Sequence, residues 1–409
     1  MERYDSYKDC GIYYLPLMPS DWQILRAKYL FKQEQRPVKD SDEIITCFRD
    51  GQVTLRRNRR IDGFTNSLKE IGYQGVRRGD LVIHNMDAFA GAIGISDSDG
   101  KATPVYSCCT PLLESIDSYY YCFFLRYLAK SNFILSLAKG IRERSTDFRF
   151  SDFKKLYLPV PSYSEQQAIA TYLDEETGKL DAAVEKLERM VEVLKERKQL
   201  IISKAVTRGL DDSIPLKDSG VEWIGQIPEH WNLFRLRYLC KIKTGDKDTV
   251  NRVENGIYPF FVRSPKVERI NSYSFDGEAV LMAGDGVGAG KVFHHVNGKF
   301  GCHQRVYILH NFNKIIGLFL YYFMQNKFQH TIEQLSAKST VDSVRLNMIQ
   351  DFCVSLPSLT EQTAIAAYLD EKVGKLDEAI EKQLRMIELL KERKQILISD
   401  VVTGKIKVA

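Results

Sequence analysis

The sequence contains little of what marks metal, redox or membrane proteins. Its eight cysteines are scattered, apart from the adjacent Cys108 and Cys109, and none stands in a C-x-x-C spacing. With no secretory signal either, we expect neither disulfides nor a zinc site. The longest apolar run, residues 315–324, is far shorter than the roughly 20 residues of a membrane-spanning helix. We therefore expect a soluble, cytoplasmic protein.

Charge of one sign is not in large excess either. The formal net charge is +5 at pH 7, and the isoelectric point is near 8.6. This small excess fits nucleic-acid binding if the positive charges cluster, and fits an ordinary soluble protein equally well. With 409 residues, 44% of them hydrophobic, the chain can bury the cores of two or three domains. Composition thus excludes wholesale disorder without choosing a function.

What the sequence does have is an internal repeat. A shift of 196 positions places residues 164–208 on residues 360–404, with 29 identities over the 45 positions. Both copies contain Glu-Gln, Tyr-Leu-Asp-Glu and Lys-Glu-Arg-Lys-Gln at matching places. So many identities indicate a duplicated element.

A second match uses a shift of 209. It places Pro19 and Trp22 on Pro228 and Trp231, and further matches surround them. Between these openings and the repeated tails, the two halves barely resemble one another. Each half therefore consists of a shared opening, a divergent body and a shared tail. We place the boundaries at 1–160 and 211–356 for the two bodies with their openings, and at 161–210 and 357–409 for the two tails.

The shared tails have the pattern of long helices. Pro161 and Pro357 precede them, Ser164 and Thr360 are the expected N-caps, and Gln167 would complete a capping box. Apolar residues then recur with a seven-residue rhythm over about five heptads, which is typical of a coiled coil. The seam positions are Leu173, Thr177, Leu180, Val184, Leu187, Val191, Leu194, Ile201 and Ala205 in the first copy, and Leu369, Val373, Leu376, Ile380, Ile387, Leu390, Leu397 and Val401 in the second.

Each tail has one apolar face and so needs a partner. Because a body lies between the two copies, an antiparallel pairing can return each helix along the other, with the bodies at opposite ends of a rod. A helix of 45 residues spans about 67 Å. The alternative is that each helix packs only on its own domain. Gly178 and Gly374 lie inside the pattern, at a cost of roughly 1 kcal/mol each relative to alanine.

The bodies show short β-rich runs with glycine turns, such as residues 80–84 and 279–282, and one apolar helix candidate each, residues 119–138 and 315–329. The expected fold class is therefore mixed α/β (α+β), with two globular domains separated by two long helices that form an antiparallel coiled coil.

Basic residues concentrate in the bodies. The densest cluster is Arg56 to Arg60, and for this run we favour contact with DNA, because arginine pairs with phosphates and guanine edges. For any other single residue, a solvated surface charge is the simpler interpretation. The candidate DNA-binding residues are Arg56, Arg57, Arg59, Arg60, Arg77, Arg78, Arg142, Arg144, Lys247, Arg263, Lys266, Lys291, Arg305 and Lys338.

Two further patterns are weak. His294, His295 and His303 lack a carboxylate or cysteine at ligand spacing, so we interpret them as core or DNA-facing residues and predict no metal site. The glycine-rich run 284–290 resembles a phosphate loop only loosely. We interpret it as a turn at a strand end, open to close approach by DNA.

At this point the sequence resembles the specificity subunits of type I restriction–modification systems. The resemblance is carried by Pro19-Ser20-Asp21-Trp22 and Pro228-Glu229-His230-Trp231, by Pro-x-x-x-Glu-Gln at 161–166 and 357–362, and by helices that end in Lys-Glu-Arg-Lys-Gln. It extends over nearly the whole chain.

The resemblance implies two target-recognition domains, each reading half of a bipartite site on double-stranded DNA. The helices would set the spacer and dock two modification (methyltransferase) subunits, through which restriction subunits would join. The family's S-adenosylmethionine, ATP and magnesium would then belong to those partners. This chain has neither an Asn-Pro-Pro-Tyr motif nor a G-x-x-x-x-G-K-[ST] loop, so we expect no catalytic site and no cofactor here.

Two other hypotheses remain open at this point. One is a nuclease or methyltransferase fused to its own recognition domains, which the missing motifs disfavour. The other is a coiled-coil protein without any DNA function. The bases read by the chain do not follow from the sequence, because the register of side chains on bases depends on loop geometry.

Overall fold

A computed structural model of the chain describes residues 2–59, 70–137, 147–336 and 343–408, with the side chains of 331 and 333–336 left aside. The chain divides into two units. Unit 1 contains residues 1–187 and 385–409, and unit 2 contains residues 188–384. Both long helices, α4 (Tyr163–Arg208) and α7 (Leu359–Val402), pass from one unit into the other. Each unit therefore contains a body and one part of each helix.

Unit 1 is a mixed α/β body. Its α-helices are α1 (Ser118–Lys130), α2 (Phe133–Ser136) and α3 (Phe150–Phe153), and its short 3-10 helices are η1 (Ala27–Tyr29), η2 (Arg56–Asn58) and η3 (Ala88–Ala90). Its strands are β1 (Tyr7–Ile12), β2 (Leu15–Pro19), β3 (Gln23–Arg26), β4 (Phe31–Gln33), β5 (Ile45–Cys47), β6 (Val53–Leu55), β7 (Gln74–Val76), β8 (Leu81–His84), β9 (Ile93–Ile95), β10 (Gly100–Ala102), β11 (Tyr106–Pro111) and β12 (Tyr157–Val160). The main sheet has the order β4-β11-β8-β9 and is antiparallel.

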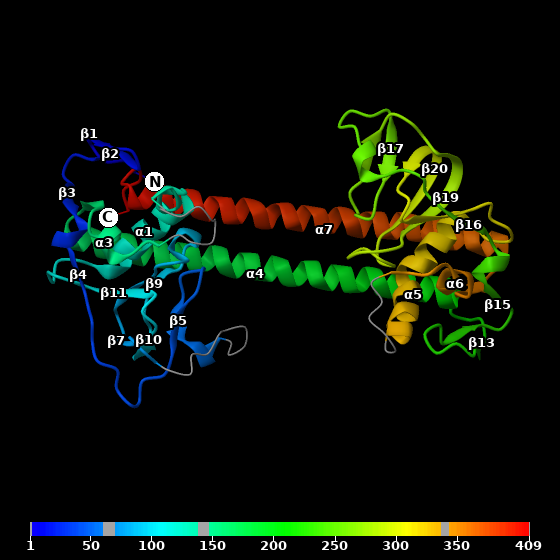
Figure 1. Cartoon of the computed structure of the whole chain (residues 1–409), viewed down its shortest axis with the longest axis horizontal. Coiled ribbons are helices and arrows are strands. Elements are labelled where there is room, and N and C mark those ends of the chain that lie inside the picture. Colours follow the sequence, from blue (N-terminus) through cyan, green and yellow to red (C-terminus); the bar gives the residue numbers. More distant parts are fainter. Residues whose placement is uncertain (1, 60–69, 138–146, 337–342, 409) are drawn as a thin grey trace. The chain divides into compact units, whose positions relative to one another are not determined.

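Unit 2 repeats this plan with longer strands. Its helices are η4 (Leu236–Tyr238), η5 (Thr249–Asn251), α5 (Gly317–Ser336) and α6 (Leu346–Gln350). Its strands are β13 (Leu216–Asp218), β14 (Gln226–Pro228), β15 (Asn232–Arg235), β16 (Lys241–Thr244), β17 (Tyr258–Phe261), β18 (Glu268–Ile270), β19 (Phe275–Ala283), β20 (Phe293–Cys302), β21 (Val306–His310) and β22 (Cys353–Leu356). The main sheet has the order β16-β21-β19-β20-β17-β18, with β17 and β20 parallel, and α5 lies against β19 and β20 (Figure 1).

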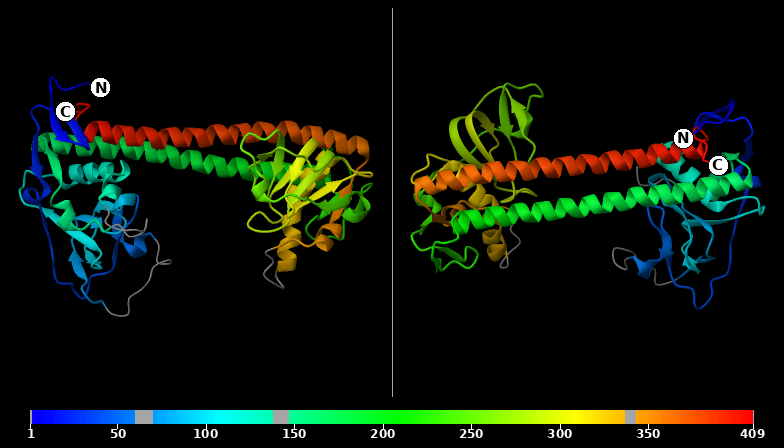
Figure 2. Two further views of the ribbon diagram at one scale, coloured as in Figure 1. Left: turned by 45° about the horizontal axis from the view of Figure 1, so that its top comes forward. Right: turned by 180° about the vertical axis from the view of Figure 1, so that it is seen from behind.

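Within each unit the two long helices are antiparallel (Figure 2). In unit 2, Ile202 near the end of α4 shares a core with Leu369 near the start of α7, and Lys198 donates to Asp377 at 2.7 Å. In unit 1, Leu173 shares a core with Val401, and Lys394 donates to Asp181 at 2.7 Å. The shift of 196 relates the two ion pairs, so each joins a lysine of one copy to an aspartate of the other.

The seam positions of the two helices face inward. Leu173, Thr177, Val184, Val191, Leu369, Val373, Ile380, Ile387 and Val401 are buried, while Leu180, Leu187, Leu194, Ile201, Leu376, Leu390 and Leu397 are half-buried. The two glycines inside the pattern, Gly178 and Gly374, have open space where a Cβ would lie. The predicted coiled-coil face is thus the face that packs.

Two local predictions need correction. The N-caps of the long helices are Ser162 and Ser358, two residues before the predicted Ser164 and Thr360. Ser358 accepts from the N–H of Glu361, whose carboxylate accepts from the Ser358 N–H, so a capping box forms in the second copy, whereas Ser164 and Gln167 of the first copy were predicted to form one. The predicted helix 119–138 breaks at Asn132, whose φ of 62° ends α1, because asparagine tolerates the left-handed region.

The two chain ends belong to the same unit. Glu2 pairs with Lys407, and the Tyr7 hydroxyl donates to the carbonyl of Lys405 at 3.3 Å (Figure 1). The core of unit 1 combines Trp22 and α1 with Val401 and Val402 of α7. Among the described residues, no helix combines the length and apolar character needed to cross a membrane.

Candidate nucleic-acid interface

The duplicated tryptophan and glutamate form one joint in each unit. Trp22 donates its indole N–H to Glu165 at 3.1 Å, and Trp231 donates to Glu361 at 3.3 Å. Both indoles are buried. His230 and Ser358 also bind the Glu361 carboxylate. Partial burial acts to raise the pKa of Glu361, but these hydrogen bonds outweigh it and lower the pKa to about 2.

The neighbouring glutamines form a second joint. Gln362, fully buried, accepts from the N–H of Ile316 at 2.8 Å and donates to the carbonyls of Lys314 and Pro357. Gln166 accepts from the N–H of Asp117 and donates to the carbonyls of Ser115 and Pro161 in the same way. The duplicated residues therefore attach each body to its long helix, and the divergent chemistry lies elsewhere in the bodies.

The two sheets share a register that identifies equivalent positions. His84 at the end of β8 pairs with Tyr106 of β11, as Ala283 at the end of β19 pairs with Val306 of β21. The residue after each strand end also makes an equivalent contact. The carbonyl of Asn85 accepts from the N–H of Phe148 at 2.9 Å, and the carbonyl of Gly284 accepts from the N–H of Val344 at 2.7 Å. We call this region the strand-end edge: residues 85–87, 104–105 and 147–151 in unit 1, and residues 284–286, 303–305 and 343–345 in unit 2.

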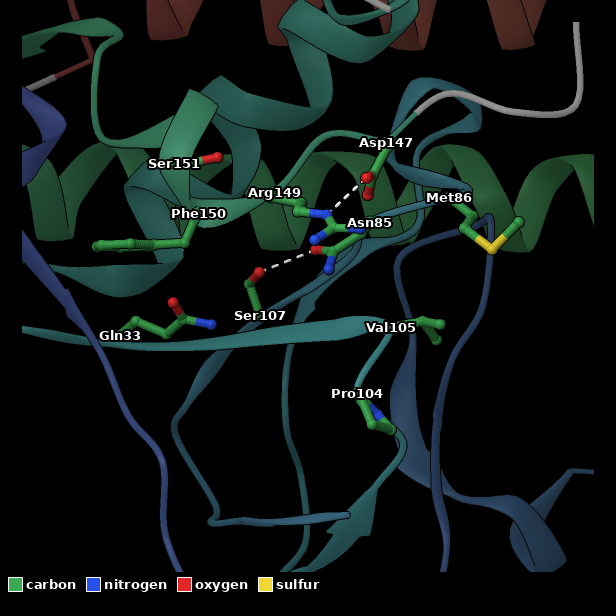
Figure 3. Close-up of a pocket in the computed structure, with 10 residues that line it drawn as sticks. All are labelled: Gln33, Asn85, Met86, Pro104, Val105, Ser107, Asp147, Arg149, Phe150 and Ser151. Atoms are coloured by element: carbon green, nitrogen blue, oxygen red, sulfur yellow. Dashed lines mark hydrogen bonds and ion pairs between the residues drawn. The ribbon is translucent and has the colours of Figure 1, made fainter. Parts of the chain in front are cut away.

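In unit 1 the strand-end edge is hollow, with a cavity of about 820 Å³. Figure 3 shows Asn85 and Ser107 turned toward one another, with Ser107 donating to the Asn85 side chain at 2.8 Å. Arg149 lies above them and pairs with Asp147 at 2.5 Å, while Gln33 of β4 lines another part of the wall. Amide, hydroxyl and guanidinium groups thus line one concave surface.

In unit 2 the same edge carries a compact charged group. Asp285 binds Arg263 at 3.1 Å through one carboxylate oxygen and Arg305 at 2.5 Å through the other. Partial burial acts to raise the pKa of Asp285, but the hydrogen bonds from Arg305 and Arg263 outweigh it, so the pKa is lowered. The carboxylate remains ionised at neutral pH and holds both guanidinium groups.

Within the Arg56–Arg60 cluster, Arg56 and Arg57 lie on η2, Arg59 follows it, and both Arg57 and Arg59 are paired with acids. Arg57 binds Glu43 at 2.6 Å, and Arg59 binds Asp50 at 2.6 Å while stacking over Phe48. Arg56 is half-buried and hydrogen-bonds Thr46. Contact of this cluster with DNA stays a prediction. Arg60, Arg142, Arg144 and Lys338 lie outside the described residues.

The remaining basic candidates differ in exposure. Arg77 turns inward, where it binds Asp42 and the carbonyl of Gly100, both at 3.2 Å, so its guanidinium supports the fold. Arg78, by contrast, is exposed. In unit 2 the exposed candidates are Lys266 and Lys291, whereas the half-buried Lys247 lies 3.5 Å from Asp246.

Two of the three histidines and the glycine-rich run have structural partners. His303 is buried and accepts from the N–H of Arg305 at 3.0 Å, and His295 contacts Glu278 at 2.9 Å. No three His, Cys, Asp or Glu side chains gather in a possible metal site within the described ranges. A Cβ on Gly288 would lie 2.3 Å from the carbonyl oxygen of Arg263, so this glycine lets the turn pack beside Arg263.

A search for basic residues overlooked Gln33, Asn85, Ser107 and Asp285. Their side chains are neutral or acidic. Only strand pairing places Gln33, Asn85 and Ser107 around the cavity of unit 1 and Asp285 at the strand-end edge of unit 2. Asp285 had one detectable signal, an acid two residues after a buried strand in a body rich in arginine. Sequence spacing alone does not relate Met86 to Asp285, because the segments that connect equivalent strands differ in length between the two bodies.

Comparison with known proteins finds relatives for parts of this chain. Residues 228–389 match the family model of the type I restriction modification DNA specificity domain. The EcoDI specificity subunit of Escherichia coli is 32% identical over 182 residues, which cover 44% of this chain but only 40% of that relative. The MjaVIII specificity subunit of Methanocaldococcus jannaschii is 24% identical over 303 residues, 68% of each chain.

A solved structure shares the fold. That structure concerns the complex assembly and conformational transition of the type I R-M system. Its chain superposes on this one with a TM-score of 0.66 at 17% identity. The superposition covers 95% of this chain and 99% of that one. The likeness shows that the two chains share a fold. Residues 228–389 therefore resemble the DNA specificity domain of type I restriction–modification systems, and the match to the EcoDI subunit spans less than half of either chain.

Proposed function

We propose that the chain reads a bipartite site on double-stranded DNA, one half with each body, and leaves cleavage and methylation to partner subunits. The duplicated frame with different strand-end edges carries this proposal. The same joints, Trp22 with Glu165 and Trp231 with Glu361, hold a hollow edge lined by Asn85, Ser107 and the Arg149–Asp147 pair in unit 1. In unit 2 they hold an edge with two arginines on one aspartate. Identical supports with different polar surfaces suit two readers of different sequences.

The test is an exchange of one body. Replacing residues 24–155 with the corresponding body of a relative is expected to change one half-site and leave the other intact, as read by mapping methylated sites in the genome of a host that carries the complex. The counterpart exchange of residues 233–351 is expected to change only the other half. A change in both halves after either exchange would contradict independent reading.

The second part of the proposal is that the long helices dock two modification subunits. Met190, Val193 and Leu200 on α4 are exposed apolar residues. The shift of 196 places them on Met386, Leu389 and Ile396 of α7, which are exposed as well. The first set lies in unit 2 and the second in unit 1, so each unit presents an equivalent apolar stripe. Repeated exposed stripes favour two copies of one partner.

The mass of the assembled complex, which gives the number of bound modification subunits, tests this docking. Leu389→Glu is expected to leave a complex with one modification subunit instead of two, because a charge would be buried in the apolar contact. Val193→Glu is expected to have the same effect at the other stripe, and the double variant should retain no modification subunit. Gln395→Glu adds the same charge at an exposed polar position of α7 and should retain two. Two bound subunits in the double variant would exclude the stripes as docking surfaces.

A further inference from the structure

The arginine pair on Asp285 is built as a rigid, outward-facing group. The Asp285 side chain is only 13% exposed, whereas those of Arg263 and Arg305 are 44% and 61% exposed. The acid is therefore the anchor, and the two guanidinium groups face solvent. Each guanidinium has five N–H donors, and the carboxylate occupies only part of them.

The backbone around the pair is held as well. His303 accepts from the N–H of Arg305 at 3.0 Å, and the Arg305 carbonyl accepts from Gly284 at 2.9 Å. Gly288 packs against the carbonyl of Arg263. Side chains fixed in this way lose little conformational freedom on binding, which favours recognition of a ligand with fixed geometry over contact with a mobile one.

We propose that Arg263 and Arg305, positioned by Asp285, read guanine in the half-site of unit 2. This inference rests on the proposed function and names the residues that carry it out. Guanine presents O6 and N7 as paired acceptors in the major groove, which match the free N–H donors of a fixed guanidinium. Phosphate offers acceptors of similar chemistry, so the experiment must separate the two.

The equivalent edge of unit 1 supports a role in specificity. By register, Met86 there takes the place of Asp285 and Val105 that of Arg305, and the buried Asn85 follows β8 directly. Unit 1 therefore has no arginine pair at this position among the residues that the structure describes. If the edge supported only the fold, the two units would have no reason to differ here while their joints stay the same.

The experiment uses the chain assembled with its modification subunits. The site of the wild-type complex is mapped first, and duplexes are then made in which each guanine of the unit 2 half-site is replaced, one at a time, by 7-deazaguanine, which lacks N7. We expect one or two such replacements to weaken the wild type about 5- to 150-fold. The same replacements should not change the affinity of Arg305→Ala or Arg263→Ala, because these variants lack the guanidinium that would donate to N7.

Asp285→Asn tests the anchor, and another cluster serves as the control. Asp285→Asn keeps the shape but loses the charge, and should reduce discrimination at the same guanine. Arg235 and Arg237 also share one acid, Asp351, but belong to the frame. Arg237→Ala is therefore expected to keep the wild-type response to every 7-deazaguanine.

The outcomes separate the explanations. Uniformly weaker binding with a lower salt slope in Arg305→Ala, with an unchanged response to 7-deazaguanine, would mean a phosphate contact and overturn the inference. Loss of thermal stability with unchanged base preference would mean a structural role and overturn it too. If the exchange of whole bodies changes one half-site while no 7-deazaguanine effect depends on either arginine, only this inference fails. If the exchange changes both halves, the proposed function fails first.

Discussion

Trp22 donates its indole N–H to Glu165 at 3.1 Å across 143 residues of sequence. Trp231 repeats the contact with Glu361 at 3.3 Å. Each contact joins the opening of a body to the first turn of the helix that follows that body. The most recognisable residues of the sequence thus serve the attachment of the bodies, and both tryptophans are buried.

The Glu361 joint should make stability depend on pH. Its pKa is about 2 in the folded chain against 4.5 for an ordinary glutamate, so its contribution is present above about pH 4.5 and is lost as the pH falls toward 2. Glu361→Gln should destabilise unit 2 by about 1 kcal/mol at neutral pH, a figure reduced for partial exposure. Thermal unfolding followed from neutral to acidic pH should show the gap to the wild type closing.

The control for this prediction is Glu378→Gln, which removes an exposed carboxylate from the same helix. It should change stability little at any pH. A gap between wild type and Glu361→Gln that stays constant down to about pH 3 would show that the charge of Glu361 does not matter.

The glycines that end the two long helices should differ in tolerance. Gly209 and Gly404 both have positive φ, 76° and 73°. A Cβ on Gly209 would meet Trp231 at 3.3 Å, but one on Gly404 would lie 2.4 Å from the ring of Pro19. We expect Gly209→Ala to cost about 1 kcal/mol and Gly404→Ala about 3 kcal/mol, since overpacking adds to the strain. Equal losses of unfolding free energy in the two variants, measured by chemical denaturation, would contradict the expected clash of Gly404→Ala with Pro19.

The ion pair between the helices should couple more strongly than pairs along one helix. Lys198 binds Asp377 while its own side chain is only 17% exposed. A double-mutant cycle with Lys198→Met and Asp377→Asn should give a coupling near 1 kcal/mol. The exposed pair of Glu176 with Lys179, one turn apart on α4, is the control and should give a weaker coupling. Equal couplings would mean that the pair adds nothing to helix register.

The arginines of η2 are tested by salt dependence. Arg57→Ala should weaken DNA binding by the assembled complex and lower the slope of log affinity against log salt by about 0.9, the value for one phosphate. Arg57 pairs with Glu43 at an exposed position, so the protein itself should lose little stability. Arg77→Ala should instead destabilise the fold, because Arg77 binds the buried Asp42. An unchanged slope in Arg57→Ala would remove this residue from the interface.

Much of the frame was predictable because it is periodic and duplicated. The heptad rhythm from Leu173 and Leu369 identified both long helices and their packed faces, and strands β8 and β19 lie where the β-rich runs predicted them. Local detail was less accessible. The break at Asn132 and the capping by Ser358 depend on backbone angles and hydrogen bonds that apolar periodicity does not report.

The sequence by itself determined that this chain contains two copies of one frame with different bodies, because the repeated openings and tails are visible in the order of residues. Only the tertiary structure decided what the repeated residues do and where the different ones meet. Glu361 reaches Trp231 across 130 positions, and Arg263 reaches Asp285 across 22, through strand pairings whose loops vary in length. The spacing of residues along the chain does not reveal such contacts. The entropy cost of closing a loop rises only slowly with its length, so loops of many lengths can connect the same two paired strands.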